Sequence, residues 1–253
     1  MDKNARRKEI EELIRERKEL DVNEIKNRFG ISSVTVRNDL IDLERKGVIQ
    51  RLFGKAVLNE EKLEASFDET KIRNLTEKEK IGKYAANLID ENESILLYTG
   101  TTTLQIARFV DPSKRFIAVT NSIYITYELK RNTQNAKTVL IGGNFNPQTG
   151  ATYGQEAVNQ LNAYNIDKLF LAVDGIDAEH GITNDQPYET DINRAMIHKA
   201  RKVIVVADYS KVGVVSFVNM GSIKEVDTLI TDSRAPKDAV QRIMDKGVKV
   251  III

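Results

Sequence analysis

Residues 32 to 40 read Ser32-Ser33-Val34-Thr35-Val36-Arg37-Asn38-Asp39-Leu40. A serine at the start of such a stretch can cap a helix, and the apolar residues after it recur at helical spacing. The helix then carries Arg37 and Asn38 near its N-terminal end, together with the Ser33 and Thr35 hydroxyls. Because Arg can pair with guanine and Asn with adenine, we interpret this stretch as a DNA recognition helix. The alternative for Arg37 is an ordinary surface position.

Two helices are expected before the recognition helix, which makes a compact unit. The first is amphipathic and spans residues 5–20, and the second runs from Asp21, its cap, to Gly30, which can adopt the left-handed conformation of helix ends. Ser32 or Ser33 caps the third helix, and Gly47 ends it. The residues expected to face the core of this unit are Ile10, Leu13, Ile14, Ile25, Phe29, Val36, Leu40 and Leu43.

A β-hairpin is expected after the third helix, because residues 48–58 form two apolar pieces around Gly54-Lys55. This hairpin would be a wing, with Arg51 and Lys55 beside the DNA backbone, where cations add salt-sensitive affinity that is independent of sequence. A plain hairpin with solvated charges is the alternative. The predicted DNA-binding residues are Ser32, Ser33, Thr35, Arg37, Asn38, Arg51 and Lys55.

Composition restricts the classes of function only weakly. The 253 residues include 38 Lys or Arg and 37 Asp or Glu, yet residues 1–58 hold 14 of the former and 11 of the latter. This excess points toward nucleic acid at the N-terminus. The chain has no Cys and only two His, so we expect no metal site and no cofactor. Charged residues at the start are not followed by an apolar segment, and the apolar runs have strand length, so a cytoplasmic protein without membrane contact is expected.

A larger α/β domain is expected after a polar linker over residues 59–75. A Thr76-Glu77-Lys78-Glu79 capping box opens its first helix, and apolar runs then alternate with helical stretches. Such continuous runs predict a mostly parallel sheet that is covered on both faces. The expected strands are Ser94–Tyr98, Phe116–Thr120, Thr138–Ile141, Leu169–Val173, Val203–Ala207, Thr228–Thr231 and Val248–Ile253.

Polar residues follow five of these strands, at the edge of the sheet where ligands of such folds bind. The loop Gly100-Thr101-Thr102-Thr103 opens a helix, so its N–H groups and hydroxyls could hold a phosphate. Lys211 could neutralise that phosphate, Asp174 could accept hydrogen bonds from sugar hydroxyls, and Asn121 could orient either end. A ligand-free helix cap and a structural Asp174–Lys211 salt bridge are the alternatives. Glu189 is either a helix cap or a ligand of a sugar hydroxyl.

These motifs together resemble the DeoR family of bacterial sugar-metabolism repressors. The matching strings of the first unit are Ser32-x-x-Thr35-Val36-Arg37-Asn38-Asp39-Leu40, Leu43-Glu44-x-x-Gly47 and Arg51-x-x-Gly54-x-Ala56. Those of the second are Gly100-Thr101-Thr102-Thr103, Thr120-Asn121-Ser122, Gly142-Gly143, Asp174-Gly175-Ile176-Asp177, Gly181-Ile182-Thr183, Arg194-Ala195-Met196 and Asp208-x-Ser210-Lys211-x-Gly213. The resemblance implies a winged helix-turn-helix domain over residues 1–58 and, over residues 76–253, a sensor and oligomerisation domain similar to phosphosugar isomerases such as ribose-5-phosphate isomerase.

The chain departs from the family pattern in both the DNA-binding unit and the sensor unit. Phe53-Gly54-Lys55 replaces a common His-Gly-Gly at the wing, and Asn38 replaces a common Arg. Tyr98 stands where relatives usually have Asp, and Asn193 where some have Lys. The operator sequence and the effector therefore cannot be copied from relatives.

The leading hypothesis is a DNA-binding transcriptional regulator, and not an enzyme. It would repress an operon for sugar, amino-sugar or sugar-alcohol use, under the control of a phosphorylated sugar or sugar alcohol. One recognition helix covers only a half-site, so double-stranded operator DNA implies a homo-oligomer, a dimer or a tetramer. The main alternative is a phosphosugar isomerase with an accessory N-terminal domain, in which Asp174 and Lys211 move protons. A DNA-architectural protein without a ligand is the third class.

Overall fold

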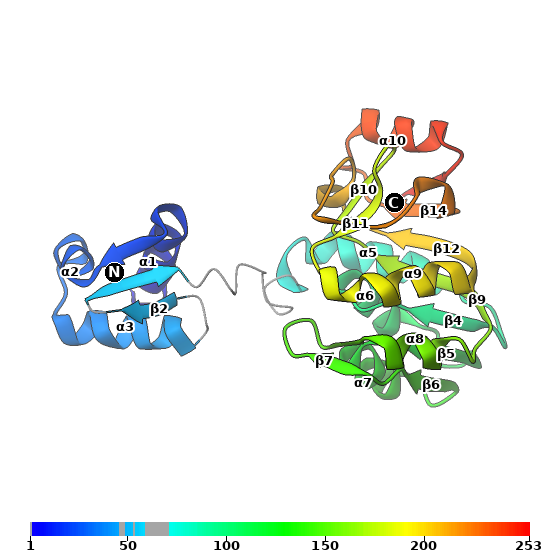
Figure 1. Ribbon diagram of the computed structural model, residues 1–253, viewed down its shortest axis with the longest axis horizontal. Helices are drawn as coiled ribbons and strands as arrows, with labels where there is room; N and C mark the ends of the chain where they lie inside the picture. Colours follow the sequence, from blue (N-terminus) through cyan, green and yellow to red (C-terminus); the bar gives the residue numbers. More distant parts are fainter. Residues whose placement is uncertain (1, 46–48, 53, 59–70) are drawn as a thin grey trace. The chain divides into compact units, whose positions relative to one another are not determined.

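The computed structural model describes residues 2–45, 49–52, 54–58 and 71–253. The chain divides into two compact units, Met1–Ser66 and Phe67–Ile253 (Figure 1). Most of the predicted linker, together with Gly47 and Phe53, lies outside the described residues. Among the described helices, none combines the length and the apolar character needed to span a lipid bilayer.

The described part of the N-terminal unit contains three helices and a small antiparallel sheet. The helices are α1 (Lys3–Arg17), α2 (Val22–Phe29) and α3 (Ser33–Arg45), and the strands β1 (Glu19–Asp21), β2 (Ile49–Leu52) and β3 (Lys55–Leu58) pair in the order β1-β3-β2. The predicted caps are confirmed, because the Asp21 side chain accepts a hydrogen bond from the Asn23 N–H and Gly30 is left-handed with φ 60°. Ser32, rather than Ser33, caps α3 through a 3.1 Å hydrogen bond from the Thr35 N–H.

The predicted end of the first helix is wrong. The helix α1 ends at Arg17, Lys18 adopts φ 69°, and Glu19–Asp21 forms a strand on β3. Leu20 is nevertheless buried with Ile10, Ile14 and the α3 face in one apolar cluster. Leu20 satisfies the helical spacing and the strand pairing equally well, so periodicity alone could not find this break.

Asp39 connects α3 to the start of α1. Its carboxylate accepts hydrogen bonds from Arg6 Nε at 2.7 Å and Arg7 Nε at 2.8 Å, and Asp39 itself is almost fully buried. Burial opposes ionisation, but the two guanidinium groups outweigh it and lower the pKa of Asp39 below its usual value. The ion pairs therefore persist at neutral pH and weaken only in acid.

We expect Asp39→Asn to destabilise the N-terminal unit by about 2 kcal/mol, the usual contribution of hydrogen bonds to charged groups. The loss should be largest above the ordinary Asp pKa and should disappear as pH falls through the lowered pKa, where wild-type Asp39 also becomes neutral. Urea unfolding monitored by circular dichroism at several pH values measures this. Equal unfolding midpoints for both proteins at pH 7 would contradict a stabilising role.

The sheet of the C-terminal unit is parallel throughout, as predicted. Within residues 71–253 its seven strands lie in the order β15-β14-β12-β9-β4-β5-β6. Each predicted strand corresponds to one of them, with small shifts at the ends. Their bounds are β4 (Ser94–Leu97), β5 (Phe116–Thr120), β6 (Ala136–Leu140), β9 (Ile166–Ala172), β12 (Ala200–Val206), β14 (Thr228–Thr231) and β15 (Lys249–Ile252).

Helices cover both faces of this sheet, and each face has its own apolar cluster. On one face lie α5 (Leu75–Ala86), α6 (Thr101–Phe109) and α7 (Ile123–Asn132). On the other lie α8 (Gln155–Leu161), α9 (Thr190–Lys199) and α10 (Lys237–Asp245) (Figure 1). Every strand of the central sheet thus has its carboxyl end at the same edge, where the connecting loops meet.

Sequence patterns missed the smaller strands. The strands β10 (Gly175–Asp177), β11 (Gly181–Asn184) and β13 (Val218–Gly221) form a separate antiparallel sheet, and β7 (Asn144–Asn146) pairs with β8 (Ala151–Tyr153). Short 3-10 turns complete the connections as η2 (Pro187–Glu189), η3 (Tyr209–Lys211) and η4 (Ile223–Glu225). Strands of three or four residues are too short for an alternating pattern to stand out.

The predicted capping box of the first sensor helix does not form. The helix α5 begins at Leu75, one residue earlier than expected, and its N-cap Asn74 is left-handed without a side-chain cap hydrogen bond. Glu77 instead pairs with Arg234 at 2.8 Å. Thr76 lies inside the helix rather than at its N-cap, so the Thr76–Glu79 pair cannot close a capping box.

Candidate functional site

The outer face of α3 presents the polar side chains that the sequence singled out. Val36, Leu40 and Leu43 are buried in the core of the unit, so Arg37 and Asn38 face solvent. Ser33 is exposed at the first position of the helix. Arg37 and Asn38 make no hydrogen bond or ion pair with another described residue, which leaves their planar groups available to base edges.

Two of the predicted hydroxyl groups are partly occupied within the protein. The Ser32 and Thr35 hydroxyls lie 2.9 Å apart and hydrogen-bond each other while Ser32 caps the helix. Val34 was missed by sequence reasoning, although it is 69 % exposed beside them. An exposed apolar residue at the start of a recognition helix suits contact with a thymine methyl group.

The wing cations are paired in the free protein. Arg51 Nη2 lies 2.6 Å from Glu44 Oε2, and Lys55 Nζ lies 2.7 Å from Glu19 Oε1. The hydrogen bond from Arg51 lowers the pKa of Glu44. Exposed pairs of this kind contribute little to stability. DNA phosphates can therefore replace the carboxylates as partners of both cations.

Loops after four adjacent strands carry the predicted effector residues. Gly100 follows β4, Asn121 follows β5, Asp174 follows β9 and Lys211 ends η3 after β12. These strands are neighbours in the order β12-β9-β4-β5, so their carboxyl ends bring the four loops together. Lys211 Nζ lies 3.0 Å from Asp174 Oδ1 in a half-exposed ion pair.

The conformation of the loop before α6 is fixed by its own contacts. A Cβ atom at Gly100 would lie 2.5 Å from the Ala172 Cβ, so its close approach to β9 requires glycine. The Thr103 hydroxyl donates to the Tyr98 carbonyl at 2.7 Å and fixes the turn. The Thr101 and Thr102 hydroxyls bond no other described residue, and the first N–H groups of a helix lack helical partners. Helix N-termini of this kind bind phosphate.

Asn121 is buried and positions the same loop. Its Oδ1 accepts a hydrogen bond from the Thr99 N–H at 3.0 Å, and its Nδ2 donates to the Thr152 carbonyl at 3.1 Å. Both ends of the amide are therefore used within the protein. The side chain orients the Gly100 loop and has little capacity left for a ligand.

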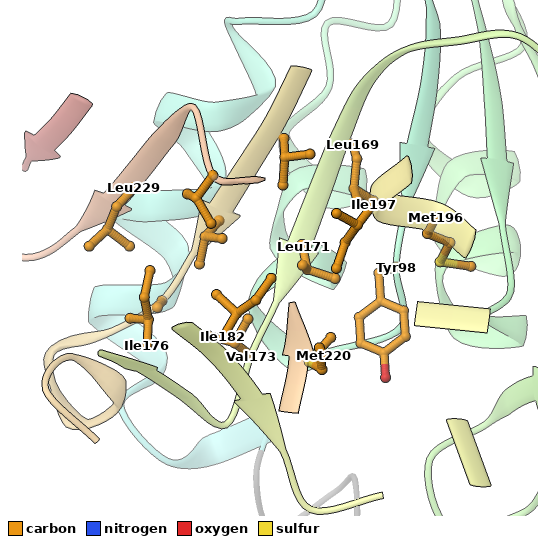
Figure 2. Close-up of a cluster of buried hydrophobic side chains, with 14 of the residues drawn as sticks. Tyr98, Leu169, Leu171, Val173, Ile176, Ile182, Met196, Ile197, Met220 and Leu229 are labelled. Atoms are coloured by element: carbon orange, nitrogen blue, oxygen red, sulfur yellow. The ribbon is translucent and has the colours of Figure 1, made fainter. Parts of the chain in front are cut away.

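The cap interpretation of Glu189 is wrong. Glu189 occupies the N-cap position of α9 but makes no side-chain cap hydrogen bond. Its Oε2 accepts from the Tyr98 hydroxyl at 2.6 Å and its Oε1 from the Thr149 hydroxyl at 3.2 Å. Figure 2 shows the Tyr98 hydroxyl pointing away from the apolar cluster that surrounds its ring. Burial raises the pKa values of both Glu189 and Tyr98.

Comparison with known proteins agrees with this geometry in both units. Residues 6–62 match the DeoR-like helix-turn-helix domain, and residues 73–233 match the DeoR C-terminal sensor domain. The chain belongs to the DeoR family of transcriptional regulators. Its architecture is therefore a winged helix-turn-helix domain followed by the family's α/β sensor domain.

Curated relatives of this DeoR-family regulator match it over nearly its full length. It is 32 % identical to a putative aga operon transcriptional repressor of Escherichia coli, over 99 % of this chain and 94 % of the relative. It is 33 % identical to the regulator GlpR of Haloferax volcanii, over 97 % of this chain and 96 % of the relative. Ribose 5-phosphate isomerase A of Methanocaldococcus jannaschii aligns with a TM-score of 0.41 at 17 % identity, over 55 % of this chain and 54 % of that one.

Lys78 is a residue of the sensor site that sequence reasoning missed. It lies in the first turn of α5 and is only 3 % exposed. Burial lowers the pKa of Lys78 to about 8, with Asp208 opposing this shift and Lys211 adding to it. The sequence predicted only a capping box at Thr76–Glu79, and no local pattern there distinguishes a lysine that tertiary packing buries.

The packing of α5 on α6 places Lys78 near the phosphate loop. Gly82 touches Gln105 so closely that a Cβ atom would overlap its side chain and backbone. Both helices start at the carboxyl edge of the sheet and lead to the other edge, so they run in the same direction. One turn before this contact, Lys78 therefore comes opposite Thr101.

The start of α5 is fastened to the loop that carries Lys211. Asn74 Nδ2 donates to Asp208 Oδ1 at 2.9 Å, and the Arg234 guanidinium, which pairs with Glu77, stacks over the Tyr209 ring at 3.9 Å. The start of α5, which follows the linker, is therefore in direct contact with the turn Asp208–Lys211.

Proposed function

We propose that this DeoR-family regulator is a repressor of an operon for sugar, amino-sugar or sugar-alcohol use, and that a phosphorylated sugar or sugar alcohol controls it. The observation that carries the proposal is the open α6 N-terminus beside Lys211 and Lys78, in a chain whose N-terminal unit presents Arg37 and Asn38. The name of the aga operon repressor supports repression of an operon, and the name of GlpR supports transcriptional regulation.

The proposed roles follow from charge and position. The α6 loop, Gly100 to Thr103, binds the phosphoryl group with Lys211 and Lys78 as counter-charges. Asp174 accepts hydrogen bonds from sugar hydroxyls once Lys211 turns to the phosphoryl group. Ser33, Arg37, Asn38 and Val34 contact base edges or phosphates, and Arg51 and Lys55 contact the DNA backbone.

Control requires that effector and DNA favour different arrangements of the protein. Binding at Lys211 breaks its ion pair with Asp174 and moves the turn to which Asn74 and the first turn of α5 are attached. In a dimer or tetramer this movement changes the spacing of two recognition helices and hence the fit to paired half-sites.

A direct test combines effector screening with operator binding. Purified protein is screened by thermal shift against hexose, pentose, aminohexose and hexitol phosphates, and operator affinity is then measured with and without each compound that binds. The proposal expects at least one compound to change operator affinity at fixed salt. Incubation with the same compounds should give no isomerisation, because we propose a sensor and not an enzyme. Turnover at ordinary enzymatic rates would overturn that part.

Effector affinity is expected to fall as pH rises through about 8, which is the pKa of Lys78 in the free protein. A bound phosphoryl dianion favours protonated Lys78 and raises that pKa, so binding takes up protons above pH 8 and is unaffected by Lys78 below it. Each unit by which effector binding raises the pKa of Lys78 should add about a tenfold drop in effector affinity at high pH. Calorimetry at pH 7, 8 and 9 measures this for the compound found by screening.

Two variants test whether Lys78 causes the loss of effector affinity above pH 8. Lys78→Met should bind weakly and without the alkaline slope, whereas Lys83→Met, which alters an exposed lysine of the same helix, should retain it. An identical slope in Lys78→Met would assign the proton uptake to another group.

A further inference from the structure

Asn193 is a buried amide without a hydrogen-bonding partner. It lies in the first turn of α9 and is 0 % exposed, and neither its Nδ2 nor its Oδ1 bonds any atom of the described chain. Leaving both ends of a buried amide unsatisfied is destabilising, and native proteins rarely do so without a functional reason. Asn193 therefore needs a polar group that the chain itself does not supply.

The surroundings of Asn193 tie it to the proposed effector site. Burial raises the pKa of the Tyr98 hydroxyl, and the Asn193 amide lies close enough to its oxygen to oppose that rise in part, without reaching hydrogen-bond geometry. Tyr98 donates to Glu189, and the charge of Asp174 acts on both. Tyr98 is also two residues before Gly100. Asn193 thus borders the cluster between the phosphate loop and Asp174.

The chemistry of this cluster selects one kind of group. An amide offers a donor and an acceptor, and a hydroxyl can satisfy both at once. An ammonium group would be attracted by Glu189 and Asp174, but it would use only Oδ1 and leave Nδ2 unsatisfied. A carboxylate would use only Nδ2 and would be repelled by Glu189 and Asp174.

We propose that Asn193 binds an uncharged hydroxyl of the phosphorylated effector, so that this regulator selects a sugar or polyol phosphate over an amino-sugar phosphate. This inference rests on the proposed function, because it assumes that the phosphoryl group lies at the α6 loop. It narrows the effector from sugar, amino-sugar or sugar-alcohol phosphates to sugar or sugar-alcohol phosphates.

Burial of Asn193 links recognition to movement. The side chain is buried in the free protein, so the hydroxyl reaches it only by a displacement of the segments packed around it. Binding and conformational change are then one event, as a sensor requires. Inorganic phosphate, which lacks the hydroxyl-bearing chain, fills the α6 loop without this displacement.

The test uses Asn193→Leu in the full chain, with inorganic phosphate, a hexitol phosphate, a hexose phosphate and an aminohexose phosphate as calorimetric probes. Wild-type protein should bind the better of the hexitol and hexose phosphates at least tenfold more tightly than the aminohexose phosphate. Asn193→Leu should weaken binding of that compound about 10- to 100-fold, the range for an unmade buried hydrogen bond. Its affinity for inorganic phosphate should stay within about twofold.

The Tm without ligand distinguishes a role of Asn193 in effector binding from a role in holding the fold. Asn193→Leu removes two unsatisfied atoms at similar volume, so its Tm without ligand should equal or exceed that of the wild type. Thr231→Val is the matched control, because Thr231 is buried on β14 with an unpartnered hydroxyl and lies outside the Asn193 cluster. It should show the same Tm behaviour with unchanged binding of every probe.

Four results overturn the inference. A Tm of Asn193→Leu several degrees below the wild type would make Asn193 structural. Unchanged affinity of Asn193→Leu for the sugar and polyol phosphates, or tighter wild-type binding of the aminohexose phosphate, would refute its selectivity while phosphate binding still supports the proposed function. Failure of the wild type to bind any phosphate compound would refute both.

Discussion

Replacing Arg37 by alanine is expected to abolish specific operator binding and to leave effector binding intact. Arg37 is exposed on α3 and has no partner among the described residues, so alanine removes a base contact without disturbing the fold. A good bidentate contact between Arg and a base contributes about 1–3 kcal/mol of discrimination against the wrong base. A dimer makes this contact in both half-sites, so the variant loses it twice. Operator affinity should therefore fall to the level of unrelated DNA. Fluorescence anisotropy with operator and scrambled duplexes at one salt concentration measures the ratio.

A charge-matched control distinguishes base recognition from general attraction. Lys237→Ala removes one exposed positive charge from α10 of the sensor unit and should leave the affinity ratio unchanged. Arg51→Ala should weaken both duplexes together and reduce the salt dependence, because a backbone contact carries no sequence information. Full operator discrimination by Arg37→Ala would remove α3 from its assigned role.

Changing Thr101 and Thr102 together to valine is expected to leave DNA binding intact and to make it unresponsive to effector. Both side chains are nearly buried at the start of α6, and valine keeps their shape while removing hydroxyls that bond no other described residue. The fold should therefore survive, whereas the phosphoryl group loses two hydrogen bonds to a charged ligand, each worth about 1.5–3 kcal/mol. Operator binding measured with rising concentrations of the screened sugar phosphate tests this.

Thr103→Val provides the contrast within the same loop. The single Thr103 O–H donates to the Tyr98 carbonyl at 2.7 Å, with the Gly100 carbonyl also within reach at 3.0 Å, so its loss should lower stability by about 1 kcal/mol. The double variant should instead melt close to the wild type without ligand. If it still responded to effector as the wild type does, the phosphate would have to bind elsewhere.

Much of the fold could be predicted because its signals are local. Asp21 and Ser32 mark helix starts through side-chain caps, and Gly30 marks a helix end through its left-handed backbone. The strands of the parallel sheet are continuous apolar runs, whereas a strand with one solvated face would alternate apolar and polar residues. The short strand at Leu20 escaped prediction because its partner strand β3 is distant in sequence. The small β10-β11-β13 sheet escaped because its strands are only three or four residues long.

The candidate site residues also divide into those with local signals and those whose partners are distant in sequence. The Gly100 loop and the Arg37 face could be found because each motif is contiguous. Glu189 could not be assigned, since its real partners Tyr98 and Thr149 come from other loops.

The sequence by itself determined the two domains, the helix that carries Arg37 and Asn38 on its exposed face, the parallel sheet and the strand-end loops, because each depends on residues within a few positions of one another. Tertiary structure alone decided that Lys78 is buried beside Lys211, that Asn121 is used within the protein and that Asn193 has no partner. The physical reason is that burial, pKa and hydrogen-bond satisfaction depend on which distant segments pack together, and the spacing of residues along the chain does not contain that information.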